Sequence, residues 1–290
     1  MTMHNSDVFS HHFGSLIRLI NRLNPTSYGR KRLESFAVLI AGLPRNGIYK
    51  VGKHVTMRLD IDDILERHLF FGSFEYIQKK IIIGFLHPGG TFLDIGANLG
   101  YYSLLASEKL GPSGKIMAFE PNPIIFRRLK ENIQINKISM IEAFNFALSD
   151  SEGEAFLFTP EVGSHGLSSI KDQVCGKSTK HCIKTKRLDD ILPNDIGKID
   201  CIKMDVEGAE LPVLRGAERI IKAFKPNMVL EINREAQSKF GYSPLDLVEF
   251  LQKANPNYTF YIITHHRVHR MSLSMLMNMP MDTNLLCVST

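Results

Sequence analysis

The sequence has few cysteines, no signal-peptide pattern and no apolar run that is long enough to span a membrane. A spanning helix needs about 20 consecutive apolar residues, whereas the longest run extends only from Phe36 to Ala41. The N-terminus has polar and acidic residues where a signal peptide has a basic start and an apolar stretch. The four cysteines are too few for a disulfide framework, and none forms a Cys-x-x-Cys pair typical of zinc sites. These absences predict a cytoplasmic protein with reduced cysteines.

Strong charge of one sign is also missing from most of the chain. The 290 residues carry a net charge of +5, and residues 51–290 hold 28 Lys/Arg and 28 Asp/Glu. A nucleic-acid-binding surface needs a basic stripe to neutralise phosphates, so we expect no nucleic-acid partner. With 44% hydrophobic and 22% charged residues, the composition is that of an ordinary globular protein. The length fits one large domain, or one domain with a smaller extension.

The positive charge is concentrated in residues 1–50, which contain seven Lys/Arg and two Asp/Glu. Apolar side chains recur there at helical spacing, at Phe9, Phe13, Leu16, Ile17, Ile20 and Leu23. We therefore expect a basic helical N-terminal extension over residues 1–50 and a main domain over residues 51–290. The apolar side of this helix would dock on the main domain or lie on an anionic membrane surface as a peripheral contact. A mitochondrial leader is a third interpretation.

From residue 80 onward, short apolar segments alternate with amphipathic ones. This alternation predicts an α/β fold with a doubly wound, mostly parallel sheet and helices on both faces. The expected strands are 91–95, 115–119, 140–147, 201–205, 228–232, 259–264 and 285–289, and the expected helices are 101–110, 124–136, one through Leu211, Leu214 and Ile220, and 245–253. No long helix separates the last two strands, which favours an antiparallel pair.

Residues 151–195 interrupt this alternation as an insertion. Within it, residues 155–158 and 182–186 have the composition of a strand pair, and residues 163–169 form a loop rich in glycine and serine. Long insertions in compact domains are usually functional. We therefore interpret this insertion as a lid on the substrate side.

The sharpest local signal is the loop from Asp94 to Gly100, which follows a strand and opens a helix. Gly96 and Gly100 let the backbone approach a ligand closely, and the helix N-terminus offers free N–H groups to an anionic part of that ligand. Glu120 ends the next strand, where a carboxylate can accept hydrogen bonds from both hydroxyls of a ribose. A tight strand–helix turn without a ligand has the same loop pattern, but Glu120 favours a cofactor that contains ribose.

The choice between cofactors depends on two side chains of this loop. The carboxylate of Asp94 would repel the pyrophosphate of NAD, whereas it suits a ligand that bears an ammonium and a sulfonium. Asn98 stands where dinucleotide-binding loops have their middle glycine. Both features favour S-adenosylmethionine over NAD.

Acidic side chains follow the ends of two later strands. Asp205 ends the strand 201–205, and Glu207 follows it two residues later. Glu231 ends the strand 228–232, with Asn233 two residues on. In an open parallel sheet, ligands bind beyond the carboxyl ends of the strands. These acids could orient a bound hydroxyl and accept its proton, or Asp205, Glu231 and Asn233 could hold a divalent ion such as Mg²⁺. The alternative is a plain turn whose acids interact with the N-terminus of the next helix. This alternative explains Asp205 less well, because an apolar strand delivers Asp205 to the edge of the pocket.

Asp150 and three histidines are further candidates. Asp150 follows the third strand, where its carboxylate could accept a hydrogen bond from the exocyclic amine of adenine, although a plain Ser-Asp turn explains it equally well. His265 is a candidate general base because histidine titrates near neutral pH. The same holds for His266 and His165, and each is alternatively a solvated loop residue.

Taken together, the segments FLDIGANLGYYSLLAS, AFEPNP, FALSD, IKMDVEGAE and VLEIN resemble the FkbM-type methyltransferases. The similarity covers about residues 55–235 and includes FGSFE at 71–75. The resemblance implies a class I, Rossmann-like methyltransferase with a seven-stranded sheet and a reversed last strand. It also implies that Asp94, Gly96, Asn98, Gly100, Glu120 and Asp150 contact S-adenosylmethionine, and that Asp205 and Glu207 line the reaction site.

The sequence also restricts which atom is methylated. It contains no Pro-Pro pair, so the Asn/Asp-Pro-Pro-aromatic motif of base-amino methyltransferases is missing, and no Pro-Cys dipeptide provides a nucleophile for carbon methylation. We therefore expect O-methylation of a hydroxyl on a sugar, a lipid or another small molecule. Two alternatives are an NAD-dependent oxidoreductase, for which we find no Tyr-x-x-x-Lys relay, and a non-catalytic module that binds the cofactor.

Overall fold

The computed structural model describes residues 44–160, 178–193, 196–264, 267–278 and 283–289. The chain divides into two compact units, residues 1–76 and residues 77–290. In the first unit, β1 (Asn46–Lys50) and β2 (Thr56–Asp60) form an antiparallel hairpin, and α3 (Ile64–Phe71) follows. The boundary expected after residue 50 therefore falls inside a hydrogen-bonded hairpin. The helix expected near the N-terminus lies outside the described residues.

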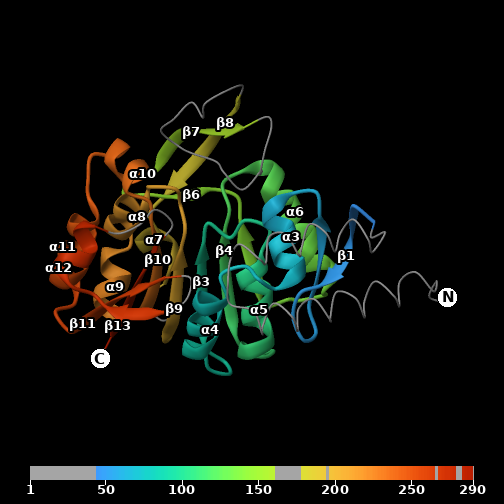
Figure 1. The fold of residues 1–290 in the computed structure, drawn as a ribbon, viewed down its shortest axis with the longest axis horizontal. Coiled ribbons are helices and arrows are strands. Elements are labelled where there is room, and N and C mark those ends of the chain that lie inside the picture. Colours follow the sequence, from blue (N-terminus) through green and yellow to red (C-terminus); the bar gives the residue numbers. More distant parts are fainter. Residues whose placement is uncertain (1–43, 161–177, 194–195, 265–266, 279–282, 290) are drawn as a thin grey trace. The chain divides into compact units, whose positions relative to one another are not determined.

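The second unit is built on a central, mostly parallel sheet (Figure 1). Its strands in spatial order, for the described residues, are β12 (Val268–Arg270), β11 (Tyr258–Ile263), β13 (Thr283–Ser289), β10 (Asn227–Ile232), β9 (Ile199–Met204), β3 (Thr91–Ile95), β4 (Lys115–Phe119) and β5 (Ile141–Phe144). From β10 to β5 all neighbours are parallel, whereas β13 is antiparallel to both β10 and β11. This confirms the doubly wound sheet with its reversed last strand. The short β12 adds an eighth strand at the edge.

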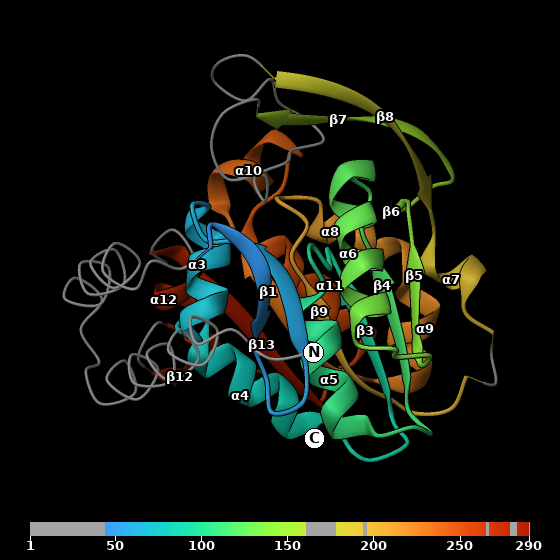
Figure 2. The same ribbon diagram turned by 90° about the vertical axis from the view of Figure 1, so that its right-hand side faces the viewer.

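Helices cover both faces of this sheet (Figures 1 and 2). On one side lie α5 (Tyr101–Leu110) and α6 (Pro123–Ile135), and on the other lie α7 (Leu188–Ile191), α8 (Glu210–Gly216), α9 (Glu218–Phe224) and α11 (Pro244–Ala254). The other helices of the described residues after residue 75 are α4 (Tyr76–Phe85), α10 (Arg234–Lys239) and α12 (Leu273–Met277). The central strands β3 and β9 are buried along their whole length, as strands covered on both faces must be. Their carboxyl ends are the place where side chains can reach a ligand.

The strand that was expected over residues 140–147 is divided in two. β5 ends at Phe144, and β6 (Ala147–Leu148) leaves the central sheet to pair with β8 (Ser178–Lys186). Between them, the side-chain nitrogen of Asn145 donates to the backbone carbonyls of Glu120 and Pro121. This turn toward the end of β4 stops β5 from continuing along the sheet.

The helix that was expected through Leu211 and Ile220 is also divided, into α8 and α9. The break follows Gly216, which packs closely on the turn after β6: a β-carbon on Gly216 would lie 1.9 Å from the carbonyl oxygen of Ser149. Because of this contact between Gly216 and Ser149, the chain ends α8 at Gly216 and begins α9 at Glu218 instead of continuing as one straight helix.

The insertion contains the strand pair that was expected. β7 (Gly153–Pro160) and β8 (Ser178–Lys186) are antiparallel, and β6 joins β8 to complete a three-stranded sheet. Buried Thr159 near the end of β7 accepts a hydrogen bond at 3.1 Å from the side chain of Asn122, at the start of α6. The hairpin is thereby attached beside the carboxyl end of β4. The loop 163–169 lies outside the described residues.

Within the described part of the chain, none of the helices is both long enough and apolar enough to span a membrane.

Candidate active site

The loop after β3 lies at the carboxyl edge of the central sheet and has the tight geometry that its glycines allow. Gly96 and Gly100 have φ angles of +76° and +88°, which L-residues with a β-carbon rarely adopt. The backbone N–H groups of Gly96 and Ala97 donate to the carbonyl of Phe119 at the end of β4. Gly100 then opens α5, whose first turn is directed at the same edge.

Asp94 is completely buried below this loop. Its Oδ2 accepts hydrogen bonds from the backbone and the hydroxyl of Ser103, at 3.0 and 2.6 Å. Its Oδ1 is buried without a hydrogen-bond partner among the described residues. Burial raises the pKa of Asp94, while the Lys203 ammonium and the bonds from Ser103 act against that rise. One oxygen thus orders α5, and the other is left for a donor that the described residues do not supply.

Glu120 at the end of β4 is nearly buried and accepts two backbone hydrogen bonds. Its two oxygens bind the N–H groups of Asn98, at 2.9 Å, and Asn122, at 2.8 Å. Burial raises the pKa of Glu120 to about 7, although these bonds oppose the rise. Asn98 adopts a left-handed backbone with φ +51°. This conformation turns its N–H toward Glu120, so the carboxylate fixes the loop and retains lone pairs for a ribose.

Asp205, directly after β9, is in contact with the same loop. Its N–H donates to the carbonyl of Ile95 at 3.0 Å. A β-carbon on Gly96 would lie 1.8 Å from the carbonyl oxygen of Asp205. The side chain of Asp205 is 30% exposed, so its carboxylate is accessible at the rim. The structure thus brings the expected cofactor loop and the expected catalytic acid together.

Lys203 is a residue of this site that the sequence reasoning missed. It lies in β9 and is only 4% exposed. Its Nζ donates to Asp205 Oδ2 at 3.0 Å and to the carbonyl of Gly96 at 3.2 Å. The available signal was a lysine in the middle of a mostly apolar strand, because a buried lysine requires a partner.

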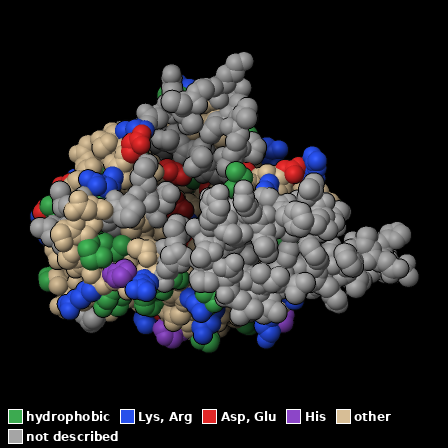
Figure 3. Space-filling model, in the orientation of Figure 1, with side chains coloured by type: hydrophobic (Ala, Val, Ile, Leu, Met, Phe, Trp, Pro, Cys, Tyr) green, Lys and Arg blue, Asp and Glu red, His purple; other side chains and the backbone are tan. Residues whose placement is uncertain are grey.

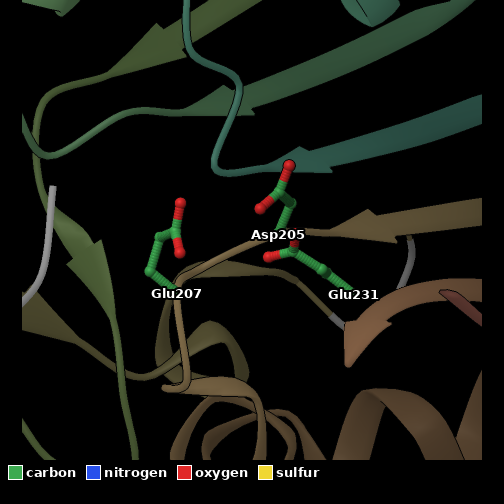
Figure 4. Close-up of side chains that lie close together, drawn as sticks. All are labelled: Asp205, Glu207 and Glu231. Carbon is green, nitrogen blue, oxygen red and sulfur yellow. The ribbon is translucent and has the colours of Figure 1, made fainter. Parts of the chain in front are cut away.

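Three acids at the ends of β9 and β10 converge in Figure 4. One carboxylate oxygen each from Asp205, Glu207 and Glu231 lies within 4.8 Å of the others. Glu207 has a left-handed backbone with φ +52°, a conformation that costs a residue with a side chain about 1–2 kcal/mol. Oxygen ligands of this kind suit a divalent cation. Asn233, which was expected with Asp205 and Glu231 where the structure has Glu207, instead uses its side-chain oxygen to cap α10 by accepting from the N–H of Ala236.

The same acids can also share a proton. The negative charge of Asp205, together with burial and the charge of Glu207, raises the pKa of Glu231 well above its usual value. Burial raises the pKa of Asp205, but the Lys203 ammonium and a hydrogen bond from Glu231 bring it below its usual value. Asp205 therefore ionises before Glu231, and Glu231 is the member of the pair that retains a proton and donates it in a hydrogen bond to Asp205.

A buried polar network supports the turn that carries Glu207. Glu210 accepts hydrogen bonds from the N–H of Gly208 at 3.1 Å and from the side chain of Gln237 at 3.2 Å. The hydroxyl oxygen of Tyr242 lies 2.8 Å from both Glu210 Oε2 and the carbonyl oxygen of Gly208. Burial raises the pKa of Glu210 despite these bonds. Glu210 is thus explained by the turn that it holds.

The remaining expected residues lie apart from this group or outside the described residues. The side chain of Asp150 accepts long hydrogen bonds from Ser149 and Ser151, and its carbonyl accepts from Arg187. These contacts tie Asp150 to its own turn rather than to Glu120 or Asp205. His265, like His165 and His266, lies outside the described residues.

In the space-filling view, acidic side chains are visible toward the middle of the face and Lys and Arg mostly near its margins (Figure 3).

The residues at this edge fit S-adenosylmethionine. The unpartnered Oδ1 of Asp94 suits an ammonium group, and Glu120 lies at the strand end where a ribose is expected. The loop from Gly96 to Gly100 has the backbone conformation needed for close approach.

Comparison with known proteins gives a consistent result. The family model described as "Methyltransferase FkbM domain" matches residues 94–258. Methyltransferase sdnD of Sordaria araneosa is 31% identical over 193 residues, which cover 54% of this chain and 74% of that protein. The hexuronic acid methyltransferase AglP of Haloferax volcanii is 29% identical over 56% of this chain and 61% of its own length. The 2-O-methyltransferase NoeI of Sinorhizobium fredii is 27% identical over 50% of this chain and 64% of its own length.

Proposed function

Because the chain belongs to the FkbM methyltransferase family and is an S-adenosylmethionine-dependent methyltransferase, we propose that it methylates a hydroxyl of a sugar, a lipid or another small molecule. The names of two relatives, a hexuronic acid methyltransferase and a 2-O-methyltransferase, support an oxygen acceptor of the sugar class. The family does not favour the alternative of an NAD-dependent oxidoreductase.

The observation that carries this proposal is the position of Asp205. Its accessible carboxylate lies against the Gly96 loop, and a lysine keeps it ionised. A group that accepts a proton from a hydroxyl must be ionised and within reach of the acceptor. Asp205 meets both requirements at the edge where the cofactor loop ends. We propose Asp205 as the proton acceptor and Asp94, Gly96, Asn98, Gly100 and Glu120 as the residues around the cofactor.

The reaction asks little covalent chemistry of the protein. When bound, S-adenosylmethionine supplies a methyl group that is already activated for transfer. The residues must align the acceptor oxygen with that methyl group and keep water away. Asp205 would take the hydroxyl proton as the carbon–oxygen bond forms and the methyl carbon–sulfur bond breaks, and neutral S-adenosylhomocysteine would be the leaving group. Glu231, which holds its own proton, donates a hydrogen bond to Asp205 and keeps the carboxylate oriented.

The test begins with a screen of hexuronic acids, neutral sugars and lipid alcohols for release of S-adenosylhomocysteine. With an acceptor found, we compare D205N with E235Q, a control at an exposed acid of α10. Loss of a positioned general base lowers turnover by about 10²–10⁴-fold. We expect this loss in D205N, an unchanged affinity for S-adenosylhomocysteine, and wild-type turnover in E235Q. Wild-type turnover in D205N would show that the proton acceptor is another group.

A divalent cation held by Asp205, Glu207 and Glu231 is the second way in which these acids could orient the acceptor. We favour the version without a metal, because the Lys203 ammonium already pairs with Asp205 and the raised pKa of Glu231 lowers the negative charge of the group further. Assays with a chelator, followed by added Mg²⁺, separate the two. Activity that the chelator abolishes and Mg²⁺ restores would replace the proton-acceptor version with the metal version.

A further inference from the structure

Lys203 is the buried cation of the candidate active site. It lies in the middle of the sheet, on β9, with 4% of its surface exposed. Burying an ammonium is costly unless it is paired and hydrogen-bonded. A side chain that only filled space in an apolar strand would not need the charge. The partners of the ammonium therefore indicate what the lysine does.

The ammonium contacts three segments: the loop after β3, the first turn of α5, and the residues directly after β9, its own strand. Its Nζ donates to the carbonyl of Gly96 in the loop after β3, at 3.2 Å, and to Asp205 Oδ2 after β9, at 3.0 Å. It also lies 5.4 Å from the centre of the Tyr102 ring in the first turn of α5, within the range of a cation–π interaction. Two of these segments belong to the proposed cofactor site, and the third carries the proposed proton acceptor.

Backbone contacts hold the loop after β3 and the loop after β9 close together. The N–H of Asp205 donates to the carbonyl of Ile95 at 3.0 Å, and Gly96 packs against the carbonyl of Asp205. These contacts fix the main chain, but they do not fix the carboxylate of Asp205, which can rotate about its own side-chain bonds. Besides the hydrogen bond from Glu231, the bond from Lys203 constrains this carboxylate, and it alone also reaches the Gly96 carbonyl of the cofactor loop.

We propose that Lys203 is a positioning residue: its ammonium, by bonding the Gly96 carbonyl and the Asp205 carboxylate at once, holds the cofactor loop and the proton acceptor in one fixed arrangement. This inference rests on the proposed function. Methyl transfer needs the donor and the acceptor oxygen aligned, and small misplacements are costly in rate. One cation shared by both loops makes the position of each depend on the other.

Hydrogen exchange of backbone amides tests this coupling without an acceptor substrate. The reporters are the N–H groups of Gly96 and Ala97, which donate to the carbonyl of Phe119 at the end of β4, and the N–H of Asp205, which donates to the carbonyl of Ile95. In K203M, we expect the exchange rates at both loops to rise together by about tenfold or more. The two bonds from Lys203 are then missing, so local opening of either loop costs less free energy. Amides of β11 and β13, at the far edge of the sheet, should keep their wild-type exchange rates.

Two further variants make the result decisive. K198M removes an exposed lysine that pairs with Asp200 at the amino end of β9, and it should leave both loops unchanged. K203M/D205N removes both charges, so it guards against K203M failing to fold with an unpaired buried carboxylate. In this double variant, we expect a recovered melting temperature but still rapid exchange at Gly96 and Ala97, since that loop has lost its donor.

The outcomes separate this inference from the proposed function. Wild-type exchange at both loops in K203M, or an equal rise throughout the sheet including β11 and β13, would overturn the positioning role. Wild-type protection of the Gly96 loop in the double variant would do the same. Titration with S-adenosylhomocysteine is the second readout: K203M should bind it about tenfold more weakly, as misplacement of the loop predicts, and K198M should bind normally. Absence of binding to the wild-type protein would instead contradict the proposed function.

Discussion

Gly96 and Asp205 lie in direct backbone contact, so that a β-carbon on Gly96 would be 1.8 Å from the carbonyl oxygen of Asp205. The two residues belong to loops that follow neighbouring parallel strands, β3 and β9. A methyl group cannot be placed there unless one of the loops moves. The contact makes the shape of the cofactor loop depend on the position of the proposed proton acceptor.

G96A should therefore lower both stability and cofactor affinity. The left-handed backbone and the overlap with Asp205 together should cost about 2–5 kcal/mol of unfolding free energy. G197A is the matched control, because Gly197 has φ +85° and open space around it. It should cost only about 1–2 kcal/mol. Urea denaturation and calorimetric titration with S-adenosylhomocysteine measure both effects, and equal costs in the two variants would contradict the close contact.

Glu120 should make cofactor binding depend on pH. Its pKa is about 7, and only the ionised carboxylate accepts hydrogen bonds from both ribose hydroxyls. As the pH falls below 7, protonation should weaken the binding of S-adenosylhomocysteine, by up to about tenfold per pH unit. Above pH 7, the affinity should level off. Calorimetric titrations between pH 5.5 and 8.5 would reveal this profile.

E120Q should weaken the binding of S-adenosylhomocysteine by about 1–3 kcal/mol at pH 8 and flatten the pH profile. E142Q, at an exposed acid on the neighbouring strand β5, provides the comparison and should behave as wild type. If E120Q kept the wild-type affinity and pH profile, the carboxylate would have no part in holding the ribose.

E231Q should keep most of the wild-type turnover, whereas D205N should lose it. Glu231 keeps its proton more readily than Asp205 and donates it in a hydrogen bond to Asp205, and the amide of glutamine can donate in the same way. E231L, which has no donor, should lower turnover. Loss of turnover in E231Q as large as in D205N would mean that Glu231 acts as a carboxylate.

The stability of E231Q should also differ from wild type in a pH-dependent way. The folded pKa of Glu231 is raised, so wild-type stability falls as the pH rises from the unfolded pKa toward the folded one. E231Q has no charge to form beside Asp205. Its melting temperature relative to wild type should therefore increase from pH 5 to pH 9, whereas a constant difference would contradict the raised pKa.

Y242F should destabilise the protein by about 1–3 kcal/mol, because buried Glu210 would lose a hydrogen-bond partner. Y261F, at a partly exposed tyrosine of β11, should change stability little. Guanidinium denaturation of both variants measures the difference. Equal stability of the two variants would show that the hydroxyl of Tyr242 does not support the turn at Gly208.

The regular strands of this fold follow directly from the sequence, and the irregular ones do not. The expected ranges 91–95 and 115–119 match β3 and β4 because continuous apolar runs bounded by glycine leave little choice. The split of 140–147 depends on Asn145 reaching the carbonyl of Glu120, a contact across 25 residues of sequence. Local patterns carry no information on such a partner.

The residues of the candidate site also fall into those that the sequence predicts and those that it does not. Residues fixed by a strand end and a glycine turn, such as Asp94, Glu120 and Asp205, are expected from sequence because the topology brings strand ends together. Lys203 and the proton on Glu231 depend instead on which side chains meet in the interior. A single sequence records their identities but not their distances.

The place of β13 in the sheet has a consequence for the order in which the chain can assemble. β13 follows β11 and β12 in the chain, yet it lies between β10 and β11 and pairs with both. During synthesis, the segment containing β11 therefore has only the short β12 to pair with, and no connection to β10, until residues 283–289 have left the ribosome. The half of the sheet from β5 to β10, with the whole candidate site, can form earlier. Ribosome-bound chains that stop short of β13 should thus protect the amides of β3 and β9 while those of β11 still exchange freely.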